Sequence, residues 1–309
     1  MVLCSLCGTK EAIYFRPYSG ERLCGGCFCD SIEERVRRTI SKYEMFEYNS
    51  RIAVGVSGGK DSLSLLHILT KIEEKFPKAE LIAITVDEGI KGYRDEAIGL
   101  AEEECRKLGV EHRVLSFKEL FNYTLDEIAE RTHSGTLTPC SFCGVLRRRA
   151  LNAAAREVGA DRLVTAHNLD DMAQTVLLNI LRGDHRRLML LDPAGGAITE
   201  KFVRRVKPYC EVPERESVLY AYLKGIEFQS LPCPYAEMAM RSDIRNFLNS
   251  MEAKRPGTMF IVFQSIQRIL PVLKKEGGLL GVCPLCGEPT TGEICRTCEM
   301  LQYLESKKR

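Results

Sequence analysis

The chain has 309 residues, and its 44 lysines and arginines nearly balance its 42 aspartates and glutamates. This length is enough for a substantial core in one large or two moderate domains, and the near-neutral charge excludes a globally basic nucleic-acid binder. No apolar run has membrane-spanning length and the N-terminus lacks a signal-peptide pattern, so we expect a soluble, cytoplasmic protein. In such a compartment the fourteen cysteines indicate metal or redox chemistry and not disulfides.

The first thirty residues are rich in cysteine. Two CxxC pairs occur there, and two more lie near the C-terminus; the eight cysteines are Cys4, Cys7, Cys24, Cys27, Cys283, Cys286, Cys295 and Cys298. Two CxxC turns supply the four thiolates of one tetrahedral zinc, and a closed four-cysteine site is structural. A rubredoxin-like iron or a redox pair is the alternative. The pattern predicts a zinc module over residues 1–30 and a zinc ribbon with a basic tail over 276–309.

Between these modules, strand and helix patterns alternate. After a helix at 31–47, strands are predicted at 51–56, 81–86, 112–115 and 162–166, and helices at 62–75, 93–108, 118–131 and 144–158. Alternation of this kind predicts an α/β, Rossmann-like fold with a parallel sheet covered by helices on both faces. A flexible loop is predicted at 183–199, followed by helices at 214–224, 236–254 and 257–273. We assign residues 31–275 to one catalytic domain.

The first predicted strand of this domain leads directly into Ser57-Gly58-Gly59-Lys60-Asp61-Ser62. Glycines let the backbone approach an anion, and the start of the next helix supplies free N–H groups and a positive dipole end. The residues therefore predict a phosphate-binding loop. The Walker pattern is absent, which excludes an ordinary P-loop NTPase.

Two further segments follow predicted strands, Asp87-Glu88-Gly89 and His167-Asn168-Leu169-Asp170-Asp171. Ligands of open α/β sheets bind at the carboxyl ends of the strands, so both segments should lie beside the phosphate-binding loop. Asp171 is the candidate to position a base or magnesium. The expected surroundings of a bound nucleotide are Val86, His133, Ser134, Gly135 and His167; for the two histidines a structural role is an equal alternative.

Three more cysteines form an incomplete set. Cys140 and Cys143 precede a predicted helix, and Cys233 lies between two prolines. Three thiolates leave one position open, which suits a [4Fe–4S] cluster with one reactive iron. A third zinc, or a cysteine pair that cycles through a disulfide, remains possible on spacing alone. Cys105 is expected in the core, and no pattern explains Cys29 or Cys210.

The motifs in combination resemble one family, the tRNA uridine 2-thiolation enzymes of the N-type ATP pyrophosphatase (PP-loop) superfamily, and within it the TtuA group. The matching segments are SGGKDS at 57–62, PCSFCG at 139–144, HNLDD at 167–171, PCPY at 232–235 and a four-cysteine module at each end. The resemblance implies that residues 57–62 bind ATP and that Cys140, Cys143 and Cys233 carry a [4Fe–4S] cluster. It also implies a homodimer and a ubiquitin-like sulfur carrier with a C-terminal thiocarboxylate.

The expected reaction is ATP-dependent sulfur transfer to tRNA. AMP is transferred to the C2 oxygen of a uridine while Lys60 neutralises the phosphates, and sulfur from the open iron replaces the activated oxygen. The preferred target is the T-loop 5-methyluridine. Clustered arginines would contact tRNA phosphates; they are Arg35, Arg37, Arg38, Arg147, Arg148, Arg149, Arg182, Arg186, Arg187, Arg204 and Arg205.

Several alternatives remain at this stage. The enzyme could thiolate the wobble uridine instead, or use a persulfide on Cys233 without a cluster. An amide-forming or lysidine-type ligase would share the phosphate-binding loop but would not need the three cysteines. An RNA-binding scaffold built on zinc ribbons would not need Lys60 or Asp171.

Overall fold

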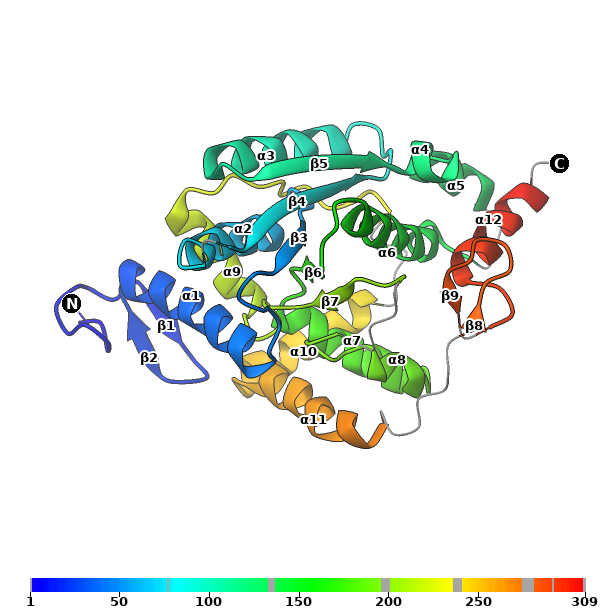
Figure 1. Ribbon diagram of the computed structural model, residues 1–309. Coiled ribbons are helices and arrows are strands. Elements are labelled where there is room, and N and C mark those ends of the chain that lie inside the picture. Colours follow the sequence, from blue (N-terminus) through cyan, green and yellow to red (C-terminus); the bar gives the residue numbers. More distant parts are fainter. Residues whose placement is uncertain are drawn as a thin grey trace.

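A computed structural model describes residues 2–76, 78–132, 137–195, 201–235, 241–273, 281–290 and 292–307. Its centre is a five-stranded parallel sheet with strand order β5-β4-β3-β6-β7 (Figure 1). The strands are β3 (Arg51–Gly55), β4 (Glu80–Asp87), β5 (Glu111–Ser116), β6 (Arg162–Thr165) and β7 (Arg204–Val206). The predicted α/β parallel-sheet class is therefore confirmed.

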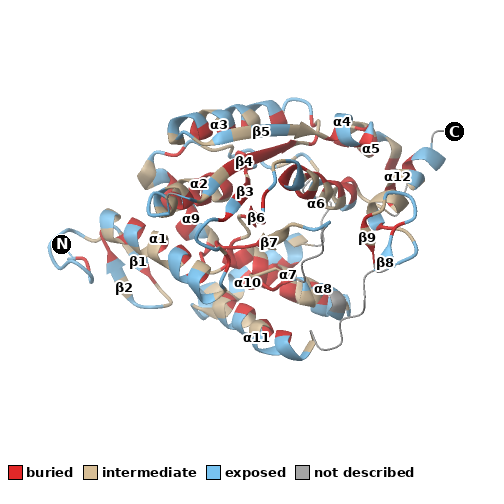
Figure 2. Cartoon of the chain, viewed as in Figure 1, coloured by how far each residue is buried: buried red, intermediate tan, exposed pale blue. Residues whose placement is uncertain are grey.

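Apolar side chains on both faces of the sheet hold helices against it, and the central strands are buried (Figure 2). Val54 of β3 packs in one cluster with side chains of α2 (Lys60–Glu73), α3 (Arg94–Leu108) and α9 (Glu214–Lys224). Its neighbour Ala53 points the other way, into a cluster with α6 (Pro139–Glu157). This alternation follows from the two-residue repeat of a strand, and it places α6 opposite α2.

The remaining helices form two outer groups. One contains α7 (Leu169–Leu181), α8 (His185–Met189), α10 (Arg241–Lys254) and α11 (Thr258–Leu273), which share an apolar cluster. The other packs beside α6 and contains α4 (Phe117–Phe121), α5 (Leu125–Thr132) and α12 (Arg296–Ser306). Among the described residues no helix is both long enough and apolar enough to cross a membrane.

The two cysteine modules have the same construction and lie at opposite ends of the molecule (Figure 1). A short antiparallel hairpin precedes a helix in each: β1 (Tyr14–Arg16) and β2 (Glu21–Leu23) before α1 (Gly25–Lys42), and β8 (Gly281–Val282) and β9 (Pro289–Thr290) before α12. A cysteine, Cys24 or Cys295, stands at the N-cap of the helix in both modules.

Several predicted elements differ from the structure. The helix expected at 118–131 is divided into α4 and α5 because Asn122 adopts the left-handed conformation (φ 62°). The helix expected from residue 144 begins at Pro139, since proline suits the first helical turn. The helix expected at 31–47 runs from Gly25 to Lys42. The segment predicted as a loop at 183–199 contains the short helix α8, and the strand β7 follows it. The C-terminal tail predicted after Cys298 contributes to the helix α12.

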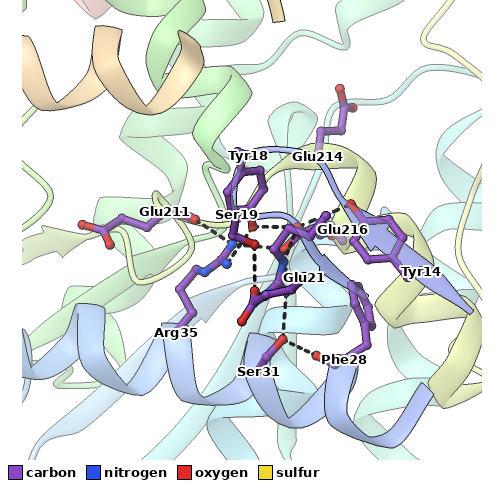
Figure 3. A network of polar contacts seen from close by, with 12 residues as sticks. Tyr14, Tyr18, Ser19, Glu21, Phe28, Ser31, Arg35, Glu211, Glu214 and Glu216 are labelled. Carbon is purple, nitrogen blue, oxygen red and sulfur yellow. Dashed lines mark hydrogen bonds and ion pairs between the residues drawn. The ribbon is translucent and has the colours of Figure 1, made fainter. Parts of the chain in front are cut away.

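Each terminal module is anchored to the central α/β body by a buried glutamate, Glu216 at one end and Glu288 at the other. Glu216 of α9 is fully buried, and its carboxylate lies 3.0 Å from Arg16 Nε and 3.0 Å from Arg35 Nη1, while Tyr18 donates to it at 2.7 Å (Figure 3). At the other end Glu288 forms ion pairs with Arg149 and Arg156 of α6. Each module is therefore held by paired charges as well as by apolar contacts.

The Glu216 network makes a stability prediction. Glu216→Gln removes the buried counter-charge of Arg16 and Arg35, and Arg16, whose side chain is 4% exposed, then keeps only its pair with the more exposed Glu21 at 2.9 Å. Removing one member of a buried ion pair costs about 3–5 kcal/mol when the remaining charge has no partner; because Glu21 remains, we expect the free energy of unfolding to fall by about 2 kcal/mol. A denaturant titration measures this loss. The control Glu103→Gln, which breaks a pair between exposed side chains, should leave the midpoint unchanged; equal midpoints for both variants would contradict the prediction.

Candidate active site at the carboxyl edge of the sheet

The phosphate-binding loop lies at the switch point of the sheet, where β3 adjoins both β4 and β6. Gly58 has φ +79°, and a Cβ atom there would approach the carbonyl oxygen of Ala97 to 2.1 Å, so only glycine fits against α3. The Ser62 hydroxyl accepts from Ser57 N at 3.0 Å and donates to Gly59 O at 3.0 Å. Gly59 caps α2 without a side-chain acceptor, which leaves N–H groups at the helix start available to an anion.

Lys60 stands at the first position of α2 between two carboxylates. Its Nζ is 3.0 Å from Asp61 Oδ2 and 3.0 Å from Glu214 Oε1. Burial lowers the pKa of Lys60, but Asp61 and Glu214 outweigh it and raise the pKa above its ordinary value. The ammonium group is therefore charged and positioned beside the loop, where it can meet a phosphate.

Asp170 and Asp171 are at the start of α7, next to this lysine. Asp170 Oδ2 accepts from the backbone N–H of Glu214 at 2.7 Å, and burial is the main cause that raises its pKa to about 6. Asp171 forms a capping box with Asn168, and Arg241 Nη2 approaches Asp171 Oδ1 at 3.3 Å. The predicted carboxylate is thus at the site, but an arginine that sequence reasoning missed already pairs with it.

Of the other residues predicted to surround a bound nucleotide, the structure describes Val86 and His167. The carbonyl of Val86 accepts from Arg94 Nη2 at 2.9 Å, at the end of β4. His167 Nδ1 lies 2.9 Å from Thr165 Oγ1; burial, then Arg205 and Lys207, keep the pKa of His167 well below its ordinary value, so the ring is neutral. His133, Ser134 and Gly135 lie outside the described residues.

The cysteine pair lies on the first turn of α6, where a spacing of three residues places both thiols on one face. Cys140 Sγ donates to Tyr235 O at 3.1 Å, which places the segment that follows Cys233 against this turn. Cys143 and Cys233 belong to one apolar cluster. Phe142 of α6 and Tyr303 of α12 pack in the same cluster, with their ring centroids 6.1 Å apart. The structure therefore brings the three predicted cysteines together.

Sulfur spacing separates the two kinds of cysteine site. In each set of four cysteines all Sγ atoms lie within 4.8 Å of one another. That spacing suits one tetrahedral zinc, because Zn–S bonds of about 2.3 Å place the sulfurs about 3.8 Å apart. Among the described residues, the Sγ atoms of Cys140, Cys143 and Cys233 do not all lie within 4.8 Å of one another. A [4Fe–4S] cluster is larger than a single ion, so a wider set of three thiols fits it.

Three charged side chains connect the phosphate-binding loop to the cysteine helix. Arg94 donates to Ser57 O at 3.1 Å, and its Nε lies 2.7 Å from Glu88 Oε2. The second oxygen, Oε1, lies 2.7 Å from Arg147 Nε, and Arg147 donates to Cys143 Sγ at 3.1 Å. The two halves of the site are therefore joined through Glu88. Sequence reasoning placed the turn at 87–89 at this edge but did not identify Glu88 or Arg94.

The arginine clusters are only partly available to an external ligand. Most of their described members have partners in the chain: Arg35 with Glu216, Arg37 and Arg38 with Glu34, Arg147 with Glu88, Arg149 with Glu288, and Arg187 with Asp184. Arg148 and Arg205 have no acidic partner among the described side chains. Burial, followed by the neighbouring Arg148, lowers the pKa of Arg205 to about 10. Burial and Arg205 lower that of Lys207 to about 7. Lys207 is buried and donates to the carbonyls of Leu190 and Asp192 at 2.9 and 3.1 Å, and the charge of Asp192 opposes part of the lowering of its pKa. Of these three residues, Arg148 and Arg205 therefore lack an acidic counter-charge among the described side chains.

The chain is similar to proteins of one kind over its whole length. The PP-loop domain model matches residues 30–252, and the model described as the N-terminal LIM domain of the 2-thiouridine synthetase TtuA matches residues 3–29. A probable sulfurtransferase of Methanocaldococcus jannaschii is 37% identical over 100% of this chain and 89% of its own length. The tRNA 2-thiolation protein NcsA of Haloferax volcanii is 35% identical over 98% of this chain and 99% of its own length.

A solved structure agrees with these relatives. It is the U34-tRNA thiolase NcsA of Methanococcus maripaludis with its [4Fe–4S] cluster, which is 35% identical, has a TM-score of 0.86, and covers 98% of this chain and 97% of its own. Matches of this extent and identity reach across the phosphate-binding loop, the three cysteines and both terminal modules. The chain therefore belongs to the PP-loop family of tRNA 2-thiolation proteins.

Proposed function

We propose that this protein is an ATP-dependent tRNA sulfurtransferase that adenylates the C2 oxygen of a uridine and replaces it with sulfur. The observation that carries the proposal is the link between the two halves of the site. Ser57 of the phosphate-binding loop and Cys143 of the cysteine helix are joined through Arg94, Glu88 and Arg147. A ligase that shares only the loop has no need of the cysteines, and an RNA-binding scaffold has no need of Lys60.

ATP binding is assigned to residues 57–62 and the start of α2. The uncapped helix start and Lys60 receive the phosphates, and the lysine stabilises negative charge as pyrophosphate leaves. Magnesium fits beside them because Asp61 Oδ1 is buried without a hydrogen-bond partner. Mg²⁺ commonly uses one or two carboxylates plus substrate phosphates, so Asp61 and Asp171 are its proposed ligands.

Cys140, Cys143 and Cys233 are the proposed ligands of a [4Fe–4S] cluster. Bound there, the cluster supplies an open iron position that can hold sulfur. The chain's own contribution is to orient the thiols: α6 fixes Cys140 and Cys143, the Tyr235 carbonyl holds Cys140, and Arg147 donates to Cys143. Each of the two four-cysteine sets is proposed to hold one structural zinc.

The tRNA contact is assigned to Arg148 and Arg205. Arg148 lies on α6 and Arg205 on β7, both are at least partly exposed, and the charges of both reach His167. Neither arginine has an acidic partner among the described side chains, and a phosphate of the tRNA would supply the missing counter-charge. The proposed partners are tRNA, a ubiquitin-like sulfur carrier with a C-terminal thiocarboxylate, and a second copy of the chain. A cytoplasmic location is consistent with a relative named as a cytoplasmic tRNA 2-thiolation protein.

Two uridines are candidates for the target. The sequence-based prediction is the T-loop 5-methyluridine, and the N-terminal match to the TtuA model supports it. The solved U34-tRNA thiolase, however, matches both terminal modules and the body together, and it favours the wobble uridine. We therefore propose position 34 as the target and keep the T-loop as the alternative.

Mass spectrometry of tRNA from a deletion strain distinguishes the two positions. We expect loss of 2-thiouridine at position 34, with T-loop nucleotides unchanged, and recovery when the wild-type chain is supplied. A chain carrying Lys60→Ala is the control, because it should not restore the modification. Loss of T-loop thiolation alone would reverse the choice of target, and intact thiolation at both positions would contradict the proposed reaction.

A further inference from the structure

Glu88 is buried at the centre of the link between the two halves of the site. Its side chain is 3% exposed, and each of its oxygens faces a different arginine at 2.7 Å. The Glu88–Arg94 approach is an ion pair without the alignment of a hydrogen bond, whereas Arg94 donates well-formed bonds to the carbonyls of Ser57 and Val86. One carboxylate thus neutralises two cations that serve different parts of the site.

The backbone around Glu88 is fixed, so its carboxylate has a defined position. Glu88 O accepts from Leu125 N at 2.7 Å, and Gly89 N donates to Asp87 Oδ1 at 2.8 Å. Gly89 has φ +68°, and a Cβ atom there would lie 2.7 Å from Thr124. Because the backbone is held on both sides, the side chain cannot follow either arginine without losing contact with the other.

A change of charge at Cys143 is therefore expected to affect the contacts of Ser57 through Arg147, Glu88 and Arg94. When Cys143 binds an iron it is a thiolate, and the added negative charge attracts Arg147, which is already in contact with Cys143 Sγ. Any change in the pairing between Arg147 and Glu88 changes the pairing between Glu88 and Arg94. Arg94 in turn holds the carbonyl of Ser57, the first residue of the phosphate-binding loop.

We propose that Glu88 is a positioning residue that couples nucleotide binding at residues 57–62 to cluster binding at the cysteine helix. This inference rests on the proposed function, because it assumes both ligands. Coupling between two sites is reciprocal, and couplings of ordinary size change an affinity about 5-fold or more. The affinity for ATP, which adenylation of tRNA needs, would then depend on whether the cluster needed for the sulfur step is bound.

The test is calorimetric titration with a non-hydrolysable ATP analogue, under anaerobic conditions, before and after reconstitution with iron and sulfide. For the wild type we expect the dissociation constant of the ATP analogue to differ at least about 5-fold between the cluster-free and the cluster-loaded protein. Glu88→Gln keeps the shape of the side chain but removes its charge, so the ratio of these two dissociation constants should come close to one. The visible absorption spectrum reports cluster uptake independently of enzymatic activity.

A matched control separates coupling from a general loss of structure. Glu33 is also a carboxylate between two cations, Lys71 and Lys224, but it lies on α1, away from the site. Glu33→Gln should keep the wild-type ratio. If Glu88→Gln does not fold, Arg94→Lys serves instead, because a lysine cannot contact Glu88, Ser57 O and Val86 O together.

The possible failures are distinguishable. If the wild type binds no analogue or takes up no cluster, the proposed function itself fails. If it binds both, but its ratio is one or Glu88→Gln leaves the ratio unchanged, the coupling role of Glu88 is overturned and the proposed function stands.

Discussion

Cys233→Ser is expected to remove the iron–sulfur cluster and reduce tRNA thiolation below detection while leaving two zinc ions per chain. Cys233 is one of only three thiols in the wider cysteine set, and a serine hydroxyl does not replace a thiolate as an iron ligand. Both four-cysteine sets are complete without it. Iron, sulfide and zinc analysis with an anaerobic visible and paramagnetic-resonance spectrum measures the outcome.

Cys105→Ala is the matched control for this experiment. Cys105 is buried in α3 among apolar side chains and belongs to neither kind of cysteine site. The control should retain cluster, zinc and activity. Full thiolation by an iron-free Cys233→Ser protein would reject the cluster, and a wild type that is active without iron under strict anaerobiosis would favour a persulfide or disulfide mechanism.

Lys60→Ala should lower the rate of thiolation at least about 100-fold, because loss of one electrostatic donor to a developing charge has an effect of this size. The cluster should survive, since Lys60 contacts Asp61 and Glu214 and none of the three cysteines. Single-turnover thiolation and the cluster spectrum, measured on the same preparation, test both statements.

Lys71→Ala provides the comparison on the same helix. Lys71 lies at the far end of α2 and pairs with Glu33, so its loss should leave the rate near that of the wild type. Equal rates for Lys60→Ala and the wild type would show that Lys60 has no role in the reaction. A loss of the cluster in Lys60→Ala would show that the variant damages the fold as well as the loop.

Much of the fold could be predicted from the sequence because its signals are local. The apolar strand before Ser57, the glycine turn and the alternation of strand and helix define a parallel sheet, and CxxC spacing defines the terminal modules. Helix boundaries were less accurate. The start of α6 at Pro139 and the break at Asn122 depend on capping and on a left-handed residue, which apolar periodicity does not report.

The site was predicted less completely, and the reason is again physical. Lys60, Asp171 and the three cysteines belong to recognisable motifs. Glu88 and Arg241, in contrast, act through partners distant in sequence, and no spacing rule connects Glu88 to Arg147 or Arg241 to Asp171. Partners distant in sequence also explain why the predicted arginine clusters are only partly available to tRNA. Arg147 and Arg149 are adjacent to Arg148 in sequence, but they form ion pairs with Glu88 and Glu288.

The central claim is that one site both adenylates a tRNA uridine and replaces its oxygen with sulfur. The most direct measurement is the stoichiometry of one anaerobic reaction containing reconstituted enzyme, ATP, sulfide and folded tRNA, in which thiouridine, AMP and ADP are counted together. We predict one AMP for each thiouridine formed, with no ADP. Thiouridine formed without AMP, or accompanied by equal amounts of ADP and phosphate, would contradict the adenylation mechanism.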